Sequence, residues 1–391
     1  MKIGIYIKDI IFKIGGTESY AASLIYALQN IYPTAIIGII SEKYETDYQF
    51  DKVTIINKLN QKFGTNIKNG NILFFLEYYS GDGIIQRTKY YLKLRSISSQ
   101  FDIFFNVSMN LYTFMAKKNI AIIHFPIIRK TNSPDIKKYP FLFFGGLLTD
   151  KSFIKKYNLY LHNSYYTKKW FNKIWFSDEH REAVLYAPIR LIPFQNIEKR
   201  NIIMICSRIE ASKEIEILIQ AYISNDFLQE NAVLYILGST IAEDNAYINK
   251  IRNMVKSYPS QIRLIENPDR TTIEKKYNES KIFWHAKGFS HIEEIDPSAL
   301  EHLGMTTIEA MSGGCVPIVI NKGGQKEIVE HGKTGFLWDT IDLLIEKTIY
   351  LLNNPDILIN MSNVTRQSAQ GYSFGSFVSN LRKILDVAVK E

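Results

Sequence analysis

Residues 281–338 constrain the fold more than any other part of the chain. In order, they read as a buried strand, a loop, a helix, a strand, a glycine-rich turn and a further helix. Strands that alternate with helices in this way pair in parallel and are covered by the helices, as in α/β domains. The chain has 391 residues, which is enough for two such domains, each with its own core.

Two glutamates flank the first loop-to-helix junction of this stretch. Glu301 lies in the loop, Gly304 interrupts it, Met305 and Thr306 open the helix, and Glu309 follows on its second turn. The first amides of a helix carry partial positive charge and unpaired N–H groups, which suits a phosphate. One carboxylate can accept hydrogen bonds from sugar hydroxyls, and the other can face a cation that develops during a reaction. The arrangement therefore predicts a chemical site.

A second glycine-rich turn follows the strand expected at Cys315–Ile320. Gly323 and Gly324 allow the backbone of this turn to come close to a ligand. A further helix is expected from Gln325 to Glu330, and Glu327 lies in its first turn.

These residues carry a resemblance to a known family. The run EHLGMTTIEAMSGGCVPIV followed by NKGGQKEIVEHGKTGFLW resembles the donor-binding signature of the retaining glycosyltransferases of family 4, which have the GT-B fold. The paired glutamates, the GG turn and the closing G-x-x-G-F occur in the family's order. Leu303 stands where the family usually has phenylalanine, which changes packing more than chemistry.

The resemblance implies a nucleotide-activated sugar, bound mainly by the C-terminal half. Glu309 would bind the ribose hydroxyls, and Glu301 would lie closest to the sugar and support its oxocarbenium-like state. The family's further donor-binding positions correspond here to Gly15, Gly16, Thr17, Gly304, Met305, Thr306, Gly323, Gly324 and Glu327. Retention of the anomeric configuration is a family expectation.

The N-terminus has the pattern of a nucleotide-type βα unit. An apolar run at Lys2–Ile7 predicts a buried parallel strand, and Thr17–Gln29 has helical apolar spacing. The loop between them contains Gly15 and Gly16, but the G-x-G-x-x-G pattern of dinucleotide sites is absent. In the family, a GG-x-E loop at this place approaches the diphosphate and sugar of the donor. Taken alone, the glycines could also serve a plain turn between strand and helix, which is the less favoured interpretation.

His124 follows one of several further strands expected in the first half. The expected strands are Ala35–Ile40, Val53–Ile56, Ile72–Leu76, Ile103–Phe105 and Ile120–His124. They alternate with helical stretches, and open α/β sheets bind ligands at the carboxyl edge where His124 falls. Family members often have a histidine here, near the transferred sugar. Without the resemblance, a structural role is the more common one for such a residue.

Arg208 and Lys213 follow the strand expected at Asn201–Cys206. They lie five positions apart over a short loop that opens a helix, and two cations aimed at one point would stabilise a departing nucleoside diphosphate. The pair matches the family's R-x4-K motif. Glu214 departs from the family, which commonly has glycine or a small polar residue there, and it alters the local charge balance.

The second half completes a second α/β domain. Strands are expected at Val233–Gly238 and Ile262–Ile265, and helices near Asp244–Ser257, Thr271–Glu279, Asp342–Leu352 and Ser376–Val389. A linker at Pro188–Arg200 separates an N-terminal acceptor-side domain, 1–190, from a C-terminal nucleotide-sugar donor-binding domain, 191–375. The predicted fold is GT-B, two doubly wound Rossmann-like domains facing across a cleft. In that fold the last helix, here 376–391, packs back on the first domain.

Charge is unevenly distributed, and residues 136–176 are basic and aromatic. Residues 1–195 hold 26 Lys and Arg against 14 Asp and Glu, whereas residues 196–391 hold 21 against 25. The stretch 136–176 could lie on an anionic membrane, or it could be a solvated helix face with its apolar side in the core. The two interpretations carry equal weight. A nucleic-acid groove is disfavoured, because the family gives this stretch an acceptor-facing role.

Composition excludes several other classes of protein. Cys206 and Cys315 lie in apolar runs and are expected to be buried free thiols, and the histidines show no zinc-ligand spacing. No run is long and apolar enough to span a bilayer, and charged residues interrupt the N-terminal apolar stretch. A cytoplasmic location is expected, with peripheral contact at the inner face of the membrane as one interpretation. A D-x-D motif is absent, so no cofactor and no obligatory metal are expected.

The predicted activity is transfer of a sugar, a hexose from a UDP or GDP donor, to a glycan or lipid-linked acceptor in cell-surface polysaccharide synthesis. A catalytically silent nucleotide-sugar-binding subunit is an alternative, which the presence of Arg208, Lys213, Glu301 and Glu309 disfavours. A sugar-nucleotide epimerase of the same fold is a third reading, and it would convert donor without acceptor.

Overall fold

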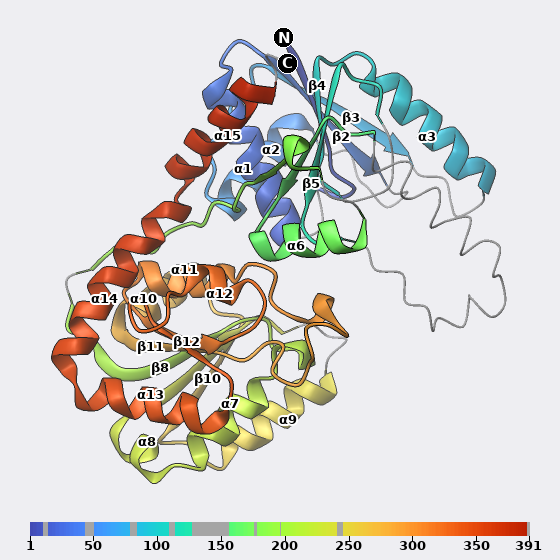
Figure 1. The fold of residues 1–391 in the computed structure, drawn as a ribbon. Helices are drawn as coiled ribbons and strands as arrows, with labels where there is room; N and C mark the ends of the chain where they lie inside the picture. Colours follow the sequence, from blue (N-terminus) through green and yellow to red (C-terminus); the bar gives the residue numbers. More distant parts are fainter. Residues whose placement is uncertain are drawn as a thin grey trace. The chain divides into compact units, whose positions relative to one another are not determined.

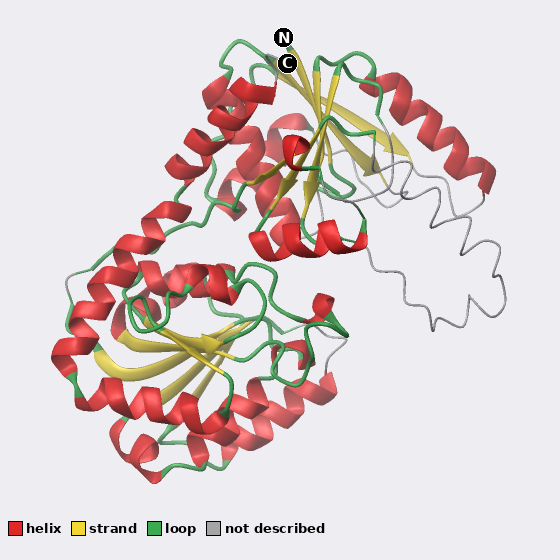
Figure 2. Ribbon diagram, in the orientation of Figure 1, coloured by secondary structure: helices red, strands yellow, loops and turns green. Residues whose placement is uncertain are grey.

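The computed structural model describes residues 1–10, 15–43, 51–78, 84–108, 114–126, 156–175, 178–195, 197–240 and 245–388 (Figure 1). The chain divides into two compact units. The first consists of Met1–Pro188 with Phe374–Glu391, and the second of Ile189–Ser373. Each unit is an α/β domain whose strands are all parallel (Figure 2).

The first unit is built on a seven-stranded sheet in the order β3-β2-β1-β4-β5-β6-β7. Its strands are β1 (Lys2–Tyr6), β2 (Ile36–Lys43), β3 (Ile72–Tyr78), β4 (Ile103–Asn106), β5 (Lys118–Ile123), β6 (Leu159–His162) and β7 (Glu182–Val184). Its helices include α1 (Gly16–Ile31), α2 (Lys52–Phe63), α3 (Ile84–Ser98), α6 (Tyr165–Ile174) and α15 (Phe374–Ala388).

The helix α15 packs on α1 within this unit (Figure 1). The ring of Phe374 stacks on Tyr26 with centroids 4.6 Å apart, and Phe377 meets Tyr20 edge to face at 5.6 Å. Such aromatic pairs add to the stability that burial already provides. The last helix is therefore fastened to the first helix of the chain by aromatic contacts.

The strand expected at Val53–Ile56 was a wrong prediction, because these residues lie inside α2. Asp51 caps this helix by accepting a hydrogen bond from the Thr54 amide at 2.9 Å. Its buried residues are Ile55, Ile56 and Leu59, a helical spacing. The β-branched run imitates a strand, but the cap and the 3.6-residue period decide the structure.

The basic, aromatic stretch 136–176 lies outside the described residues up to position 155. Where α6 is described, its aromatic side chains Tyr166, Trp170 and Phe171 are buried, whereas Lys169 and Lys173 are exposed. The described part is thus a helix with its apolar face in the core. Within the ranges given above, every helix is too short or too polar to cross a membrane.

The second unit has a six-stranded sheet in the order β10-β9-β8-β11-β12-β13. Its strands are β8 (Arg200–Cys206), β9 (Val233–Gly238), β10 (Ile262–Glu266), β11 (Ser280–His285), β12 (Val316–Ile320) and β13 (Phe336–Trp338). Its α-helices in the described residues are α7 (Ile215–Ile223), α8 (Asp226–Asn231), α9 (Asn245–Lys256), α10 (Arg270–Glu279), α11 (Met305–Ser312), α12 (Gln325–Ile328), α13 (Ile341–Asn353) and α14 (Pro355–Ala369). The sequence did not predict α14.

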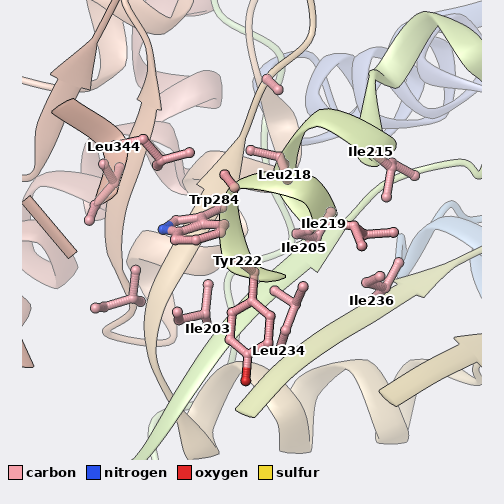
Figure 3. Close-up of a cluster of buried hydrophobic side chains, with 14 of the residues drawn as sticks. Ile203, Ile205, Ile215, Leu218, Ile219, Tyr222, Leu234, Ile236, Trp284 and Leu344 are labelled. Carbon is pink, nitrogen blue, oxygen red and sulfur yellow. The ribbon is translucent and has the colours of Figure 1, made fainter. Parts of the chain in front are cut away.

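Helices cover both faces of this sheet, with α7, α9 and α13 on one face and α10 and α11 on the other (Figure 1). Figure 3 shows the core on the α7 side, where Trp284 of β11 packs among side chains of β8, α7 and α13. The Trp284 indole N–H donates to Thr348 Oγ1 at 3.0 Å, so its polar atom is satisfied inside the core. This packing holds β11, whose end carries the site described next.

Candidate functional site

The candidate site lies where three neighbouring strands end. β8, β11 and β12 are adjacent and parallel, so the segments that leave them meet at one edge of the sheet. These segments are residues 207–214 after β8, 286–304 after β11 and 321–324 after β12. Together they carry most of the residues that the sequence assigned to the second domain.

Glu301 is the centre of a charged cluster at this edge. Its Oε2 atom lies 3.0 Å from Lys213 Nζ, 3.5 Å from His285 Nε2 and 3.8 Å from Lys287 Nζ. Burial on its own raises the pKa of Glu301, but Lys213, the His285 hydrogen bond and Lys287 outweigh burial and hold this pKa well below its ordinary value. Glu301 is therefore an ionised carboxylate inside a ring of three nitrogen groups.

Lys213 and Arg208 each pair with a different carboxylate. Lys213, at the end of a short 3-10 turn, donates to Glu301, whereas Arg208 NH1 lies 3.0 Å from Glu210 Oε2. The Arg208 side chain is 57% exposed, so it is accessible to a ligand. Each of the two cations predicted from the sequence thus has a carboxylate partner of its own.

Glu309 also has a protein partner, which the sequence did not indicate. Arg270, the first residue of α10, donates from NH1 to Glu309 Oε1 at 2.7 Å. The same guanidinium donates to Glu274 at 2.8 Å and to the Arg190 carbonyl oxygen at 3.0 Å. Burial raises the pKa of Glu309, and Arg270 opposes that shift without cancelling it.

The GG turn packs against the loop that carries Glu301. The Gly324 N–H donates to the Glu301 carbonyl oxygen at 2.7 Å. A Cβ on Gly323 would overlap that same carbonyl oxygen, and a Cβ on Gly324 would overlap the carbonyl of His302. Gly323 also has φ +60°, a conformation that favours glycine. The glycines therefore allow close approach to the chain itself and hold the Glu301 loop in place.

The junction between this loop and α11 is set by Gly304. Its φ is +98°, and a Cβ would lie 2.8 Å from the side-chain amide nitrogen of Gln325. Met305 and Thr306 form the first turn of α11 as expected, with Glu309 one turn on. Glu327 lies in the short helix α12, which the GG turn begins.

The sequence-predicted residues of the first half lie in the first unit. Gly15 is the N-cap of α1, Gly16 is its first residue and Thr17 follows in the first turn. His124 comes directly after β5, and its ring meets Tyr20 of α1 edge to face with centroids 5.4 Å apart. Burial lowers the pKa of His124 to about 4, which keeps its ring neutral at pH 7. The structure brings these four residues to the same edge of one sheet.

Three residues of the site were not predicted from the sequence: His285 and Lys287, which lie beside Glu301, and Arg270, which pairs with Glu309. His285 ends β11 and Lys287 follows two positions later, so their place at the carboxyl edge could have been found from the strand alone. Arg270 is 39 positions from Glu309, and no local pattern joins them.

Comparison with known proteins identifies the second unit. Residues 190–370 match the model of the family described as glycosyl transferases group 1. These residues are a group 1 glycosyltransferase domain. An uncharacterised glycosyltransferase of Haemophilus influenzae is 26% identical over 155 residues, which cover 39% of each protein. A Dictyostelium discoideum GDP-Man:Man(3)GlcNAc(2)-PP-Dol alpha-1,2-mannosyltransferase is 30% identical over 92 residues, 23% of this chain and 18% of that protein.

A likeness in fold to a solved structure extends over nearly the whole chain. The crystal structure of Anabaena HepE in complex with UDP and glucose superposes with a TM-score of 0.70 over 99% of this chain and 100% of that chain, at 15% identity. At this identity the likeness establishes the fold. The GT-B fold of two Rossmann-like domains, expected from the sequence, is confirmed. The group 1 glycosyl transferase match, which lies in residues 190–370, agrees with the family expected for this part of the chain. The matched segment spans well under half of either curated relative.

Proposed function

We propose that this glycosyltransferase moves a hexose from a nucleoside-diphosphate sugar to a glycan or lipid-linked acceptor, with retention of the anomeric configuration. The observation that carries the proposal is the Lys213–Glu301 pair at 3.0 Å, beside the start of α11. An ionised carboxylate and cations beside a helix N-terminus form a site for a sugar joined to a phosphate.

In the proposed reaction, the cations act on the departing phosphate and the carboxylate of Glu301 acts on the sugar. The bond between the anomeric carbon and the β-phosphate oxygen breaks, and its electron pair goes to the phosphate oxygen. Lys213 and Arg208 stabilise the negative charge that grows there, together with the first amides of α11, Gly304 to Thr306. Glu301 faces the positive charge on the sugar. The acceptor oxygen bonds to the anomeric carbon from the same face, and its proton passes to the departing phosphate.

The remaining site residues bind and orient the donor sugar nucleotide. Glu309 accepts hydrogen bonds from the ribose hydroxyls, and Arg270 keeps this carboxylate available in its ionised form. In the first unit, Gly15, Gly16 and Thr17 at the start of α1 are assigned to the donor phosphates, and the neutral His124 is assigned to the transferred sugar. Gly323 and Gly324 hold the loop that carries Glu301, and Glu327 of α12 is assigned to donor binding beside them.

UDP and GDP are the two nucleotides that the relatives suggest. HepE is named in complex with UDP and glucose, and the Dictyostelium relative is named for GDP-mannose. No cofactor and no obligatory metal are part of the proposal, because Arg208 and Lys213 supply the positive charge that a metal would otherwise bring. Transfer should therefore persist when EDTA is present, and a loss that Mg²⁺ restores would contradict this part.

The acceptor is assigned to the basic first half of the chain, residues 1–195. The proposed biological role is cell-surface polysaccharide synthesis at a membrane. The excess of lysine and arginine there suits a pyrophosphate-linked lipid or an anionic glycan. Co-sedimentation with vesicles that contain anionic lipid tests the membrane contact. Glutamate in place of the exposed Lys169 and Lys173 should reduce the bound fraction, and unchanged binding would argue against this contact.

A thermal-shift panel of UDP, GDP, ADP and dTDP tests the donor site. A diphosphate at about 100 times its dissociation constant adds roughly 2.7 kcal/mol to stability, and Glu309→Ala should abolish the shift. No shift from any of the four would contradict the proposal. Incubating a matching sugar nucleotide without acceptor separates transferase from epimerase, since only an epimerase changes the sugar in its nucleotide-bound form.

A further inference from the structure

Two charged side chains, Glu214 and Lys322, hold the loop after β11 through hydrogen bonds to its backbone. The Glu214 carboxylate accepts three hydrogen bonds from consecutive amides, those of Gly288 and Phe289 at 2.7 Å each and that of Ser290 at 2.9 Å. The Lys322 ammonium donates to the carbonyl oxygens of Gly288, Phe289 and His291 at 3.0, 2.7 and 2.8 Å. Charge-assisted hydrogen bonds of this kind are among the strong ones. The backbone on the C-terminal side of Lys287 is thus clamped.

Glu214 is held in a conformation that is unfavourable for its residue type. Its φ is +53° and ψ +39°, in the left-handed region, where a non-glycine residue costs about 1 kcal/mol or more. It is also 7% exposed, so its charge is largely removed from water. The three amide hydrogen bonds offset both costs. Glu214 stands where the family commonly has glycine or a small polar residue, and in this chain its carboxylate holds the loop that carries Lys287.

Lys287 changes the charge of the site. The two predicted cations, Arg208 and Lys213, are matched by two carboxylates, Glu210 and Glu301. Lys287 interacts electrostatically with all four of these side chains and lies 3.8 Å from Glu301. Its side chain is 16% exposed, so it is close to the surface without being freely solvated. The charges of the two cations and the two carboxylates cancel, and Lys287 adds one excess positive charge to the group.

We propose that Lys287 is a third cation for the donor's diphosphate, and that Glu214 and Lys322 position it by clamping its loop. This inference rests on the proposed function and extends it to residues outside the R-x4-K motif. When Lys213 turns from Glu301 to the phosphate, Lys287 and the ring of His285 remain beside the carboxylate. Lys287 acts through charge and hydrogen bonding and transfers no proton.

The test is titration calorimetry with UDP and GDP and with their nucleosides, uridine and guanosine. The proteins are the parent, Lys287→Gln, Lys287→Arg and, as a matched control, Lys275→Gln, whose side chain is 67% exposed and lies near Glu279. Lys287→Gln should weaken binding of the diphosphate by about tenfold or more and leave nucleoside binding unchanged. Lys287→Arg should recover part of the loss, and Lys275→Gln should bind as the parent does.

A double-mutant cycle tests the clamp. Glu214→Gln should weaken diphosphate binding in the parent background but add little in the Lys287→Gln background, because Glu214 acts through Lys287. Should Glu214→Gln not fold, the Lys287 variants decide the proposal alone.

The results distinguish a failure of the role of Lys287 from a failure of the proposed function. Equal diphosphate affinity in the parent and Lys287→Gln would overturn the role of Lys287, as would an equal loss for diphosphate and nucleoside. Failure of the parent to bind either diphosphate would overturn the proposed function itself and the inference with it.

Discussion

Glu309 Oε1 accepts a hydrogen bond from Arg270 NH1 at 2.7 Å, so the carboxylate assigned to the ribose has a charged partner within the protein. The two groups come from α11 and α10, and both side chains are mostly shielded, with 17% and 29% of their surface exposed. A shielded carboxylate is costly without its partner. Losing either partner should therefore affect both the proposed donor site and the stability of the second unit.

Arg270→Gln should destabilise the protein by about 1 to 3 kcal/mol at neutral pH. The pKa of Glu309 is raised by burial even with Arg270 present, and losing Arg270 raises it further. A raised pKa means that the folded state holds the proton more readily than the unfolded state. The cost of the substitution should therefore grow from about pH 5.5 to about pH 8, which urea unfolding at the two pH values measures.

Arg252→Gln is the matched control for this experiment. Arg252 pairs with Glu266 through two hydrogen bonds, but its side chain is 50% exposed. The Arg252 hydrogen bond lowers the pKa of Glu266, so this pair contributes fully above the unfolded pKa and weakens only in acid. Its loss should cost less than about 1 kcal/mol and change little over the same pH interval. A similar pH dependence in both variants would argue against the Glu309 explanation.

Lys213→Ala should lower the turnover number by a factor of about 10² to 10³, because it removes a cation that acts on the departing phosphate. The same substitution leaves Glu301 with Lys287 and His285 as its remaining close partners. Arg208→Ala should lower turnover as well. Transfer of radiolabelled sugar under saturating donor measures both, and turnover at the parent rate in the two variants would remove these residues from the mechanism.

Gly324→Ala should lower both stability and donor affinity. A Cβ at this position would overlap the His302 carbonyl, so the loop that carries Glu301 must shift. Gly371→Ala is the control, since a Cβ there meets no atom within 4 Å and its φ is ordinary. Thermal unfolding with and without UDP or GDP compares the two variants. Equal ligand-induced shifts in both would show that the GG turn does not hold the site.

The sequence predicted what depends on local patterns and failed where distant residues meet. Val233–Gly238 was predicted with its bounds, because a buried parallel strand is a short apolar run that turn residues delimit. Val53–Ile56 failed because the capping aspartate Asp51 was not weighed against a β-branched run. Glu301 and Glu309 stand out in the sequence motif, but the contacts that Lys287 and Arg270 make with them depend on how a loop and a helix fold back. Glu214 was noticed as a departure from the family, and only the structure shows the three amides that it binds.

His124 should make the first unit sensitive to acid. Burial holds its pKa at about 4, below the ordinary value of 6.5, so the folded state resists protonation. A histidine with a lowered pKa stabilises the fold fully above its unfolded pKa, and that contribution is lost as pH falls from about 6.5 toward about 4. His124→Gln should remove on the order of 2 kcal/mol of this acid dependence, because glutamine does not titrate. Urea midpoints across that interval measure the effect, and the exposed His180 replaced by Gln serves as the control. Parallel pH profiles for the parent and His124→Gln would mean that the ring accepts its proton in the folded state, and the neutral role given to His124 at the sugar would then fail.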